Sequence, residues 1–265
     1  MIRRFPEGLL VLFVWFAFLR NLCNKERESY TSTIMHSRIL LGILLSIFPF
    51  CAAFGQAPKK AKEIKTTGVF SDMFISRESG DVGGIELFFF NGEKDYVVIS
   101  KAEGQLQEPQ ISEVEQNGNN VQFAMRSTNM DSKPVLLKFS GIFSANKLTG
   151  KFSNGNALSL PRKKPMFMTT YSDMAHIPER GKVVGLEIIK FLADKQYVLV
   201  IQGRQQMAFG EASYQGNTLQ FALKKPDGST LSFKGTTNKT SLTGTLVEDG
   251  QPSTIKLPEK KSFWE

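Results

Sequence analysis

Two stretches of the chain carry the same motifs in the same order, about 100 residues apart. The motif Phe70–Met73 (FSDM) returns as Tyr171–Met174 (YSDM), and Leu148–Gly150 (LTG) returns as Leu242–Gly244. Between these ends the matched residues are, in order, Gly80 and Gly181, Val82 and Val183, Gly84 and Gly185, Glu86 and Glu187, Tyr96 and Tyr197, and Gln122–Ala124 and Gln220–Ala222. This shared order predicts a tandem duplication, so the chain is expected to fold as two similar units.

The duplication sets the expected domain boundaries. It predicts a linker over residues 56–69, a first unit over 70–161, a connector over 162–170 and a second unit over 171–265. The connector begins with the basic run Arg162–Pro165 (RKKP), which separates the two copies.

Within each unit the apolar residues alternate with polar ones, which is typical of strands with one buried face. Val121, Phe123 and Met125 show this period of two in the first unit. Turn signals such as Asn117–Gly118 and Asp249–Gly250 separate the runs, and turns this short join antiparallel neighbours. The prediction is an all-β fold in which each unit is an antiparallel up-and-down meander of about six or seven strands.

A free meander exposes two unpaired strand edges, which favour aggregation. Closure into a barrel removes both edges. Two arrangements satisfy this requirement: two small barrels or half-barrels, or one larger barrel built from both units. We favour two small barrels with a shared interface.

The N-terminal part of the chain resembles an export leader. Ile39–Phe50 is an apolar run of signal-peptide length, and small residues follow it, so residues 35–55 are predicted to be a signal peptide cleaved near Gly55–Gln56. Residues 1–34 carry a second apolar run and are interpreted as an extension upstream of the true start, Met35; the rival reading is a membrane-associated segment. The protein is therefore expected to be periplasmic or extracellular, with membrane contact only through an uncleaved leader.

Few residues are suited to metal or cofactor chemistry. The chain has two Cys and two His, and Cys23, Cys51 and His36 all lie within residues 1–55. His176 is left as the one imidazole of the exported part, so neither a metal site nor a cofactor is expected. The formal net charge is +8, but the basic pairs fall in linkers, turns and ends rather than on one face, so nucleic acid is not an expected partner.

Two motifs occur once in each unit and carry a family resemblance. One is the strand Gly118–Phe123, matched by Gly216–Phe221; the other is the closing hairpin from Leu148 to Pro161, matched by that from Leu242 to Pro258. This pattern of strands and turns resembles that of the lipocalin-like β-meander domains of exported bacterial proteins. The resemblance implies a barrel that holds an apolar ligand, and it implies no catalytic residue.

Glu86 and Glu187 stand in mid-strand between apolar neighbours. Pointing inward, they would form a carboxylate pair whose pKa values rise through desolvation. Pointing outward, which the alternation with Ile85 and Leu87 favours, they would be solvated. Phe88 shares the face of Glu86, however, so that face is not simply polar.

The candidate ligand cavity is completed by aromatic residues. They are Phe88, Phe90, Phe123, Phe221, Tyr96 and Tyr197, in addition to Glu86 and Glu187. The run Phe88–Phe90 also fits a strand buried on both sides, or an interface between the units. The expected function is non-enzymatic binding of an apolar or amphipathic small molecule or lipid. The alternatives are a contact with an envelope protein and an enzyme that uses the two glutamates.

The recurring Ser-Asp pairs, Ser71–Asp72 and Ser172–Asp173, admit two readings. They could contact a ligand at a barrel mouth. The favoured reading is structural, with the short side chains capping the backbone that enters the next strand.

Overall fold

The computed structural model describes residues 64–128, 132–204 and 206–265. The predicted upstream extension (1–34), signal peptide (35–55) and most of the linker therefore lie outside the described residues. Ile64 to Glu265 form one compact unit. Across the described residues, no helix has the length and apolar character needed to cross a membrane.

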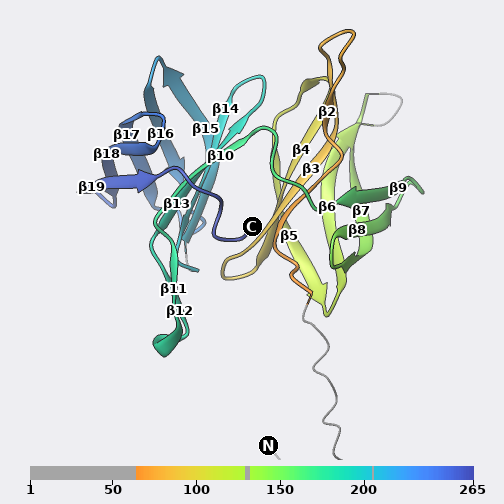
Figure 1. Ribbon diagram of the computed structural model, residues 1–265, viewed down its shortest axis with the longest axis horizontal. Coiled ribbons are helices and arrows are strands. Elements are labelled where there is room, and N and C mark those ends of the chain that lie inside the picture. Colours follow the sequence, from red (N-terminus) through yellow and green to blue (C-terminus); the bar gives the residue numbers. More distant parts are fainter. Residues whose placement is uncertain (1–63, 129–131, 205) are drawn as a thin grey trace, which may run out of the picture. The chain divides into compact units, whose positions relative to one another are not determined.

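The first repeat forms an antiparallel sheet in which sequence neighbours pair (Figure 1). Its path runs through β1 (Gly68–Ser71), β3 (Val82–Asn91), β4 (Asp95–Leu106), β5 (Gln110–Asn117), β6 (Asn120–Thr128), β7 (Pro134–Ser144), β8 (Lys147–Phe152) and β9 (Ala157–Pro161). The short β2 (Phe74–Ile75) pairs with the start of β3.

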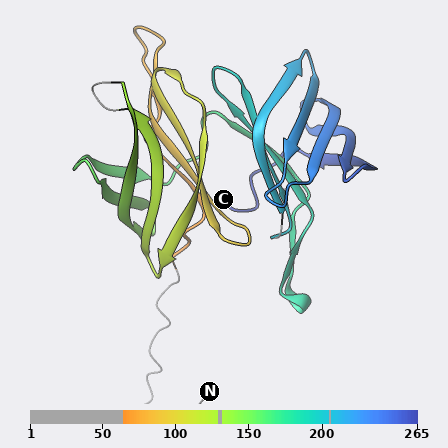
Figure 2. The ribbon, with the colours of Figure 1, turned by 180° about the vertical axis from the view of Figure 1, so that it is seen from behind.

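The second repeat forms an eight-stranded sheet with the same order (Figure 2). Its strands are β10 (Met168–Ser172), β13 (Leu186–Leu192), β14 (Gln196–Gln202), β15 (Gln206–Gln215), β16 (Thr218–Lys224), β17 (Thr230–Thr237), β18 (Ser241–Glu248) and β19 (Gln251–Pro258). Between β10 and β13 in the sequence, β11 (Ala175–Ile177) and β12 (Lys182–Val184) form a separate hairpin with the short 3₁₀ helix η2 (Pro178–Arg180) at its tip. β10 and β13 themselves pair directly with each other.

The fold class predicted from the sequence is confirmed: two nearly closed, antiparallel, barrel-like sheets. The sequence predicted about six or seven strands per unit, whereas the first sheet has nine strands, eight of them along its main path, and the second sheet has eight. All four residues of β1 are buried, so this strand shows no alternation of buried and exposed residues. β1 begins at Gly68 and β10 at Met168, within the ranges that the sequence analysis gave to the linker and the connector.

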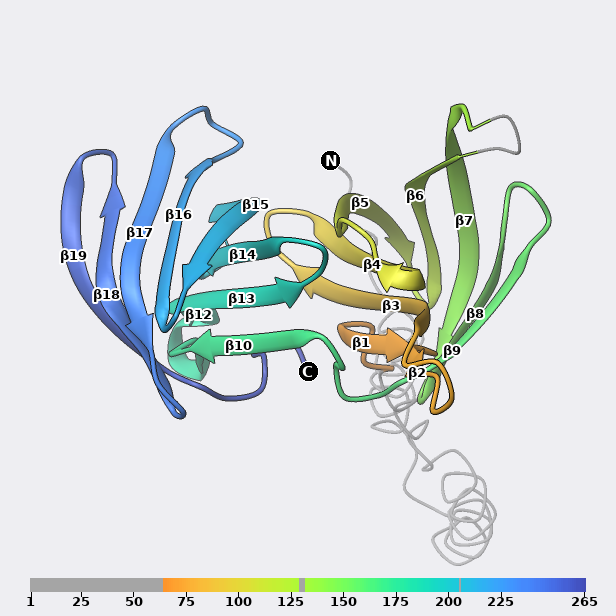
Figure 3. The same ribbon diagram turned by 90° about the horizontal axis from the view of Figure 1, so that it is seen from above.

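Each sheet closes through the residues that follow its last strand (Figure 3). In the first barrel Arg162 forms a bridge with Phe70 of β1, and in the second Glu259 forms the equivalent bridge with Tyr171 of β10. Each bridge brings the two edges of its meander together, so each sheet is nearly closed and less of its edge is left unpaired.

The interior of each barrel is a packed apolar core. Phe139 lies over a pair of facing glycines, Gly141 and Gly150, where an added Cβ would come within 2.6 Å of neighbouring atoms. Phe233 lies over Gly235 and Gly244 in the same way. Glycine is required here because two strands and an aromatic ring approach too closely for any side chain.

Candidate functional site

The residues predicted to line one cavity are divided between the barrel interiors and the faces outside them. Phe123 and Phe221 lie inside the barrels, each 4% exposed. Phe123 stacks on Phe139 with ring centroids 4.8 Å apart, and Phe221 stacks on Phe233 at 5.4 Å. Side chains therefore occupy the centre of each barrel at these levels.

The other predicted aromatic residues belong to a third apolar cluster, made by both repeats. Phe88 and Phe90 contribute from β3, and Tyr197 from β14, with Tyr96 packed against them. Phe89, between the two, belongs instead to the core of the first barrel. The run is thus a strand buried on both sides, and its outward face helps to join the two barrels.

Glu86 and Glu187 point out of their barrels but are not solvated, with exposures of 4% and 0%. Glu86 accepts a hydrogen bond from the backbone N–H of Met166 at 3.1 Å. Glu187 accepts one from Ser262 Oγ at 2.6 Å and one from the backbone N–H of Phe263 at 2.9 Å. Each carboxylate therefore holds the segment that follows the last strand of its own barrel.

The two glutamate contacts are equivalent positions of the repeat. Met166 lies five residues after Pro161, the end of β9, and Phe263 lies five residues after Pro258, the end of β19. Burial raises the pKa of both Glu86 and Glu187 above the ordinary glutamate value, while the hydrogen bonds they accept oppose that rise. We interpret the pair as two copies of one structural latch.

The C-terminal residues bring the second barrel into contact with the first. The hydroxyl of Thr67 donates to the backbone carbonyl of Trp264 at 2.8 Å, and the Trp264 side chain lies in the cluster shared by both repeats. Figure 3 shows the C-terminus between the two sheets. The indole N–H of Trp264 is buried and has no hydrogen-bond partner among the residues that the structure describes. The latch at Glu187 thus also positions a part of the contact between the barrels.

The Ser-Asp pairs follow the structural reading. Ser71 Oγ accepts the N–H of Met73 at 3.1 Å, and Asp72 Oδ1 accepts the N–H of Ile85 at 2.8 Å. Ser172 and Asp173 make the same contacts with Met174 and Leu186. These side chains fix the turn that leads from the first strand of each barrel into the following hairpin.

His176 lies exposed on β11, opposite Val183 of β12. Among the described residues, no group of three or more His, Cys, Asp or Glu is arranged to hold a metal ion.

A hollow of about 650 Å³ opens at the end of the second barrel beside the β11–β12 hairpin. Its apolar lining includes Leu186 of β13, Leu246 of β18 and Ile255 of β19. Leu186 and Leu246 belong to the barrel core and Ile255 packs against it, so the hollow lies directly on that core. None of the predicted cavity residues lines it.

Four charged side chains stand around the hollow. Lys182 on β12 and Arg204 in the turn after β14 are exposed. Asp173 is held by the N–H of Leu186 at 2.6 Å, and Glu248 forms an ion pair with Lys225 at 2.7 Å. The two acids are therefore engaged by the protein, whereas the described structure assigns the two cations no ion pair.

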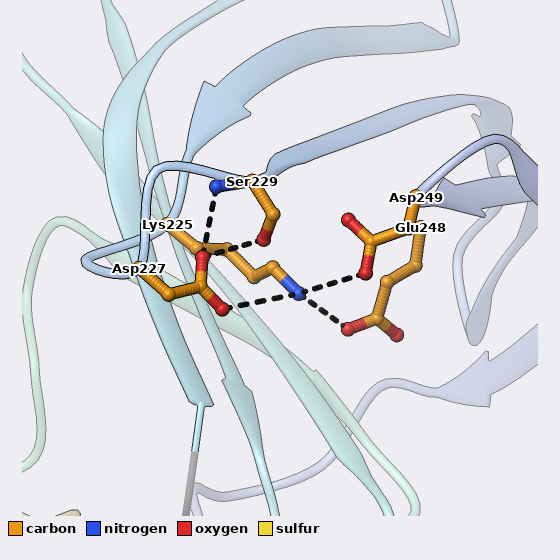
Figure 4. Close-up of polar contacts among 5 residues, drawn as sticks. All are labelled: Lys225, Asp227, Ser229, Glu248 and Asp249. Carbon is orange, nitrogen blue, oxygen red and sulfur yellow. Dashed lines mark hydrogen bonds and ion pairs between the residues drawn. The ribbon is translucent and has the colours of Figure 1, made fainter.

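Lys225 links the β16–β17 turn to the β18–β19 turn through its contacts with acidic side chains, one of which is Glu248 (Figure 4). Its side chain is only 3% exposed, and its Nζ lies 2.7 Å from Glu248, 3.7 Å from Asp249 and 3.9 Å from Asp227. The hydrogen bond to Glu248 is the main reason that the pKa of Lys225 is raised. Ser229 donates to Asp227 at 2.5 Å from its hydroxyl and 2.8 Å from its N–H, which lowers the pKa of Asp227. The cluster fixes the β16–β17 and β18–β19 turns and so orients Glu248.

The hollow was missed because its residues come from distant segments with no motif among them. A signal was nevertheless present in the repeat, since matched positions carry opposite charges. Lys182 replaces Asp81, and Arg204 replaces Glu103.

A comparison with known proteins found no matching protein-family model and no significant match to a curated protein or a solved structure.

Proposed function

We propose that this protein is an exported, non-enzymatic binding protein that holds an apolar or amphipathic small molecule in the hollow of its second barrel. The observation that carries the proposal is the hollow itself, with about 650 Å³ above a floor of Leu186, Leu246 and Ile255. Small-molecule sites commonly enclose about 300–1,000 Å³ and combine apolar walls with a few polar groups. The volume of the hollow falls within this range, and its open lining combines apolar residues with charged ones.

The resemblance to lipocalin-like domains supports the same function. Eight-stranded up-and-down barrels hold ligands where their interior is open. In this chain the ring stack of Phe221 on Phe233 occupies the interior, so the ligand would lie at the end of the barrel rather than at its centre.

An enzyme based on Glu86 and Glu187 has less support. A general acid or base must reach a substrate atom. Each of these carboxylates instead hydrogen-bonds to the backbone of the segment that follows its own barrel, and both are at least 96% buried.

Binding is tested with two fluorescent probes, 11-(dansylamino)undecanoic acid and its methyl ester. At least one should bind the full chain with a stoichiometry of one, and Leu246→Phe should abolish that signal by filling the hollow. Val184→Trp, which narrows the hollow from an exposed position of β12, provides a second blocking variant. Binding of neither probe, or binding unaffected by both variants, would overturn the proposal in favour of a protein–protein role.

The export part of the proposal rests on residues 35–55. Mass spectrometry of the protein from its native source should find an N-terminus near Gln56. A mature chain that still begins at Met1 or Met35 would contradict it.

A further inference from the structure

We infer that the molecule held in the second barrel is an amphipathic anion, with its apolar part on Leu246 and Ile255 and its acidic head group at Lys182 and Arg204. This inference rests on the proposed function and specifies the ligand class for the same hollow. Its evidence is the state of the four charged side chains that line the opening, together with the contrast between the two repeats.

The two cations are placed to receive an anion. Lys182 and Arg204 come from different elements, β12 and the turn after β14, and a backbone hydrogen bond of 2.9 Å from Gly203 to Gly185 keeps that turn beside the hairpin. Neither side chain forms a hydrogen bond or an ion pair with another residue that the structure describes. A bound carboxylate or phosphate would accept charge-assisted hydrogen bonds from both exposed side chains.

The two acids are already committed elsewhere. Asp173 accepts the N–H of Leu186, and its role in the turn is duplicated by Asp72 in the first barrel, where the rim is different. Glu248 is held by Lys225, a nearly buried ammonium at 2.7 Å. Each acid therefore has one carboxylate oxygen already engaged by the protein, in a contact that shapes the site.

The first barrel supplies the contrast. At the matched positions it carries Asp81 instead of Lys182 and Glu103 instead of Arg204. Phe152 replaces Leu246, and its ring packs on Phe139 with centroids 5.3 Å apart. The second copy thus has both a smaller residue on the floor and basic residues on the rim, a combination suited to an apolar chain with an acidic end.

The test compares the dansyl acid with its methyl ester, using only the signal that Leu246→Phe removes. The acid should bind about tenfold more tightly than the ester, as expected for hydrogen bonds to charged groups. The double variant Lys182→Asp with Arg204→Glu gives the second barrel the rim residues of the first. It should weaken binding of the acid by about tenfold or more while changing binding of the ester by less than about twofold.

The matched control is Lys147→Asp with Lys151→Glu on β8. It makes the same change in net charge at exposed residues of the first barrel and should leave both affinities unchanged. Raising the salt concentration should weaken binding of the acid and leave binding of the ester unchanged, because salt screens the attraction between exposed charges.

Two results would overturn the inference while leaving the proposed function intact. One is equal binding of acid and ester to the unmodified chain; the other is an acid preference that survives the rim exchange. If neither probe gives a signal that depends on Leu246, the proposed function fails and the inference fails with it.

Discussion

The two barrels share a scaffold but differ at one end. Both follow the same path of eight strands, and both have a ring over a glycine pair, a Ser-Asp turn and a buried glutamate that binds the following segment. They differ in the last hairpin. The pair β18–β19 runs to Glu248 and Gln251, whereas β8 stops at Phe152. The residues common to both barrels therefore maintain the fold, and a ligand site is better sought where the sequences of the two barrels differ.

The largest expected effect comes from emptying the end of the first barrel. Phe152→Ala should lower the free energy of unfolding by about 3 kcal/mol, because it leaves a cavity beside Phe139. Leu246→Ala should cost less, about 2 kcal/mol, since the hollow already lies against that residue. Urea unfolding of the two variants measures the difference. A larger loss for Leu246→Ala would mean that the two ends are packed alike.

The next effect concerns the two latches. Glu187→Ala strands two donors, the Ser262 hydroxyl and the Phe263 N–H, while Glu86→Ala strands the Met166 N–H. Ser262 is buried, whereas Met166 is 45% exposed, so water replaces the carboxylate more easily at the Met166 N–H. The loss should therefore be about 2 kcal/mol at Glu187 and smaller at Glu86. The same unfolding experiment checks this order. Equal losses would show that the Ser262 contact adds nothing to the second latch.

The latches also predict a pH dependence. Because burial raises the folded-state pKa of Glu86 and Glu187, the folded state holds their protons more tightly than the unfolded state does. Their contribution to stability is therefore fully present below the unfolded glutamate pKa of about 4.3 and is lost as the pH rises through the folded pKa.

The measurement is the unfolding free energy as a function of pH for the unmodified chain and for Glu86→Gln with Glu187→Gln. In the double variant, the unfolding free energy should decline less steeply as the pH rises above the unfolded-state pKa of glutamate. An identical pH profile would show that these groups have similar pKa values in both states.

The smallest effect is expected at a matched pair of surface ion pairs. Lys94 lies 2.7 Å from Glu113, and Lys195 lies 2.8 Å from Glu211 at the equivalent place. All four side chains are more than half exposed, and such pairs contribute little. Lys94→Ala and Lys195→Ala should both leave the thermal unfolding midpoint unchanged. A clear loss in only one of them would reveal a difference between the barrels that the packing does not show.

Much of the fold could be predicted from the sequence, because duplication and alternation report directly on strands and their buried faces. The alternation placed Glu86 correctly on the outer face of its barrel. It could not predict that this face is covered, because the covering residues come from the connector at Met166 and from the other repeat. A period of two distinguishes the faces of a strand but does not identify what packs against each face.

The candidate site was predicted less well, for a related reason. Residues common to both repeats, such as Tyr96 and Tyr197, were predicted to contact a ligand, and in the structure they lie at the apolar cluster made by both barrels. The lining of the hollow depends on Leu246, which no local pattern distinguishes from other core leucines. Only its alignment with Phe152 and the charge reversal nearby point to it.

The most direct test of the central claim is an NMR titration of Leu, Ile and Val methyl groups with 11-(dansylamino)undecanoic acid. The account predicts shift changes at Leu186, Leu246 and Ile255, and none at Leu158, which occupies the position of Ile255 in the first barrel. Equal changes in both barrels, or changes confined to the shared cluster around Ile189, would contradict it.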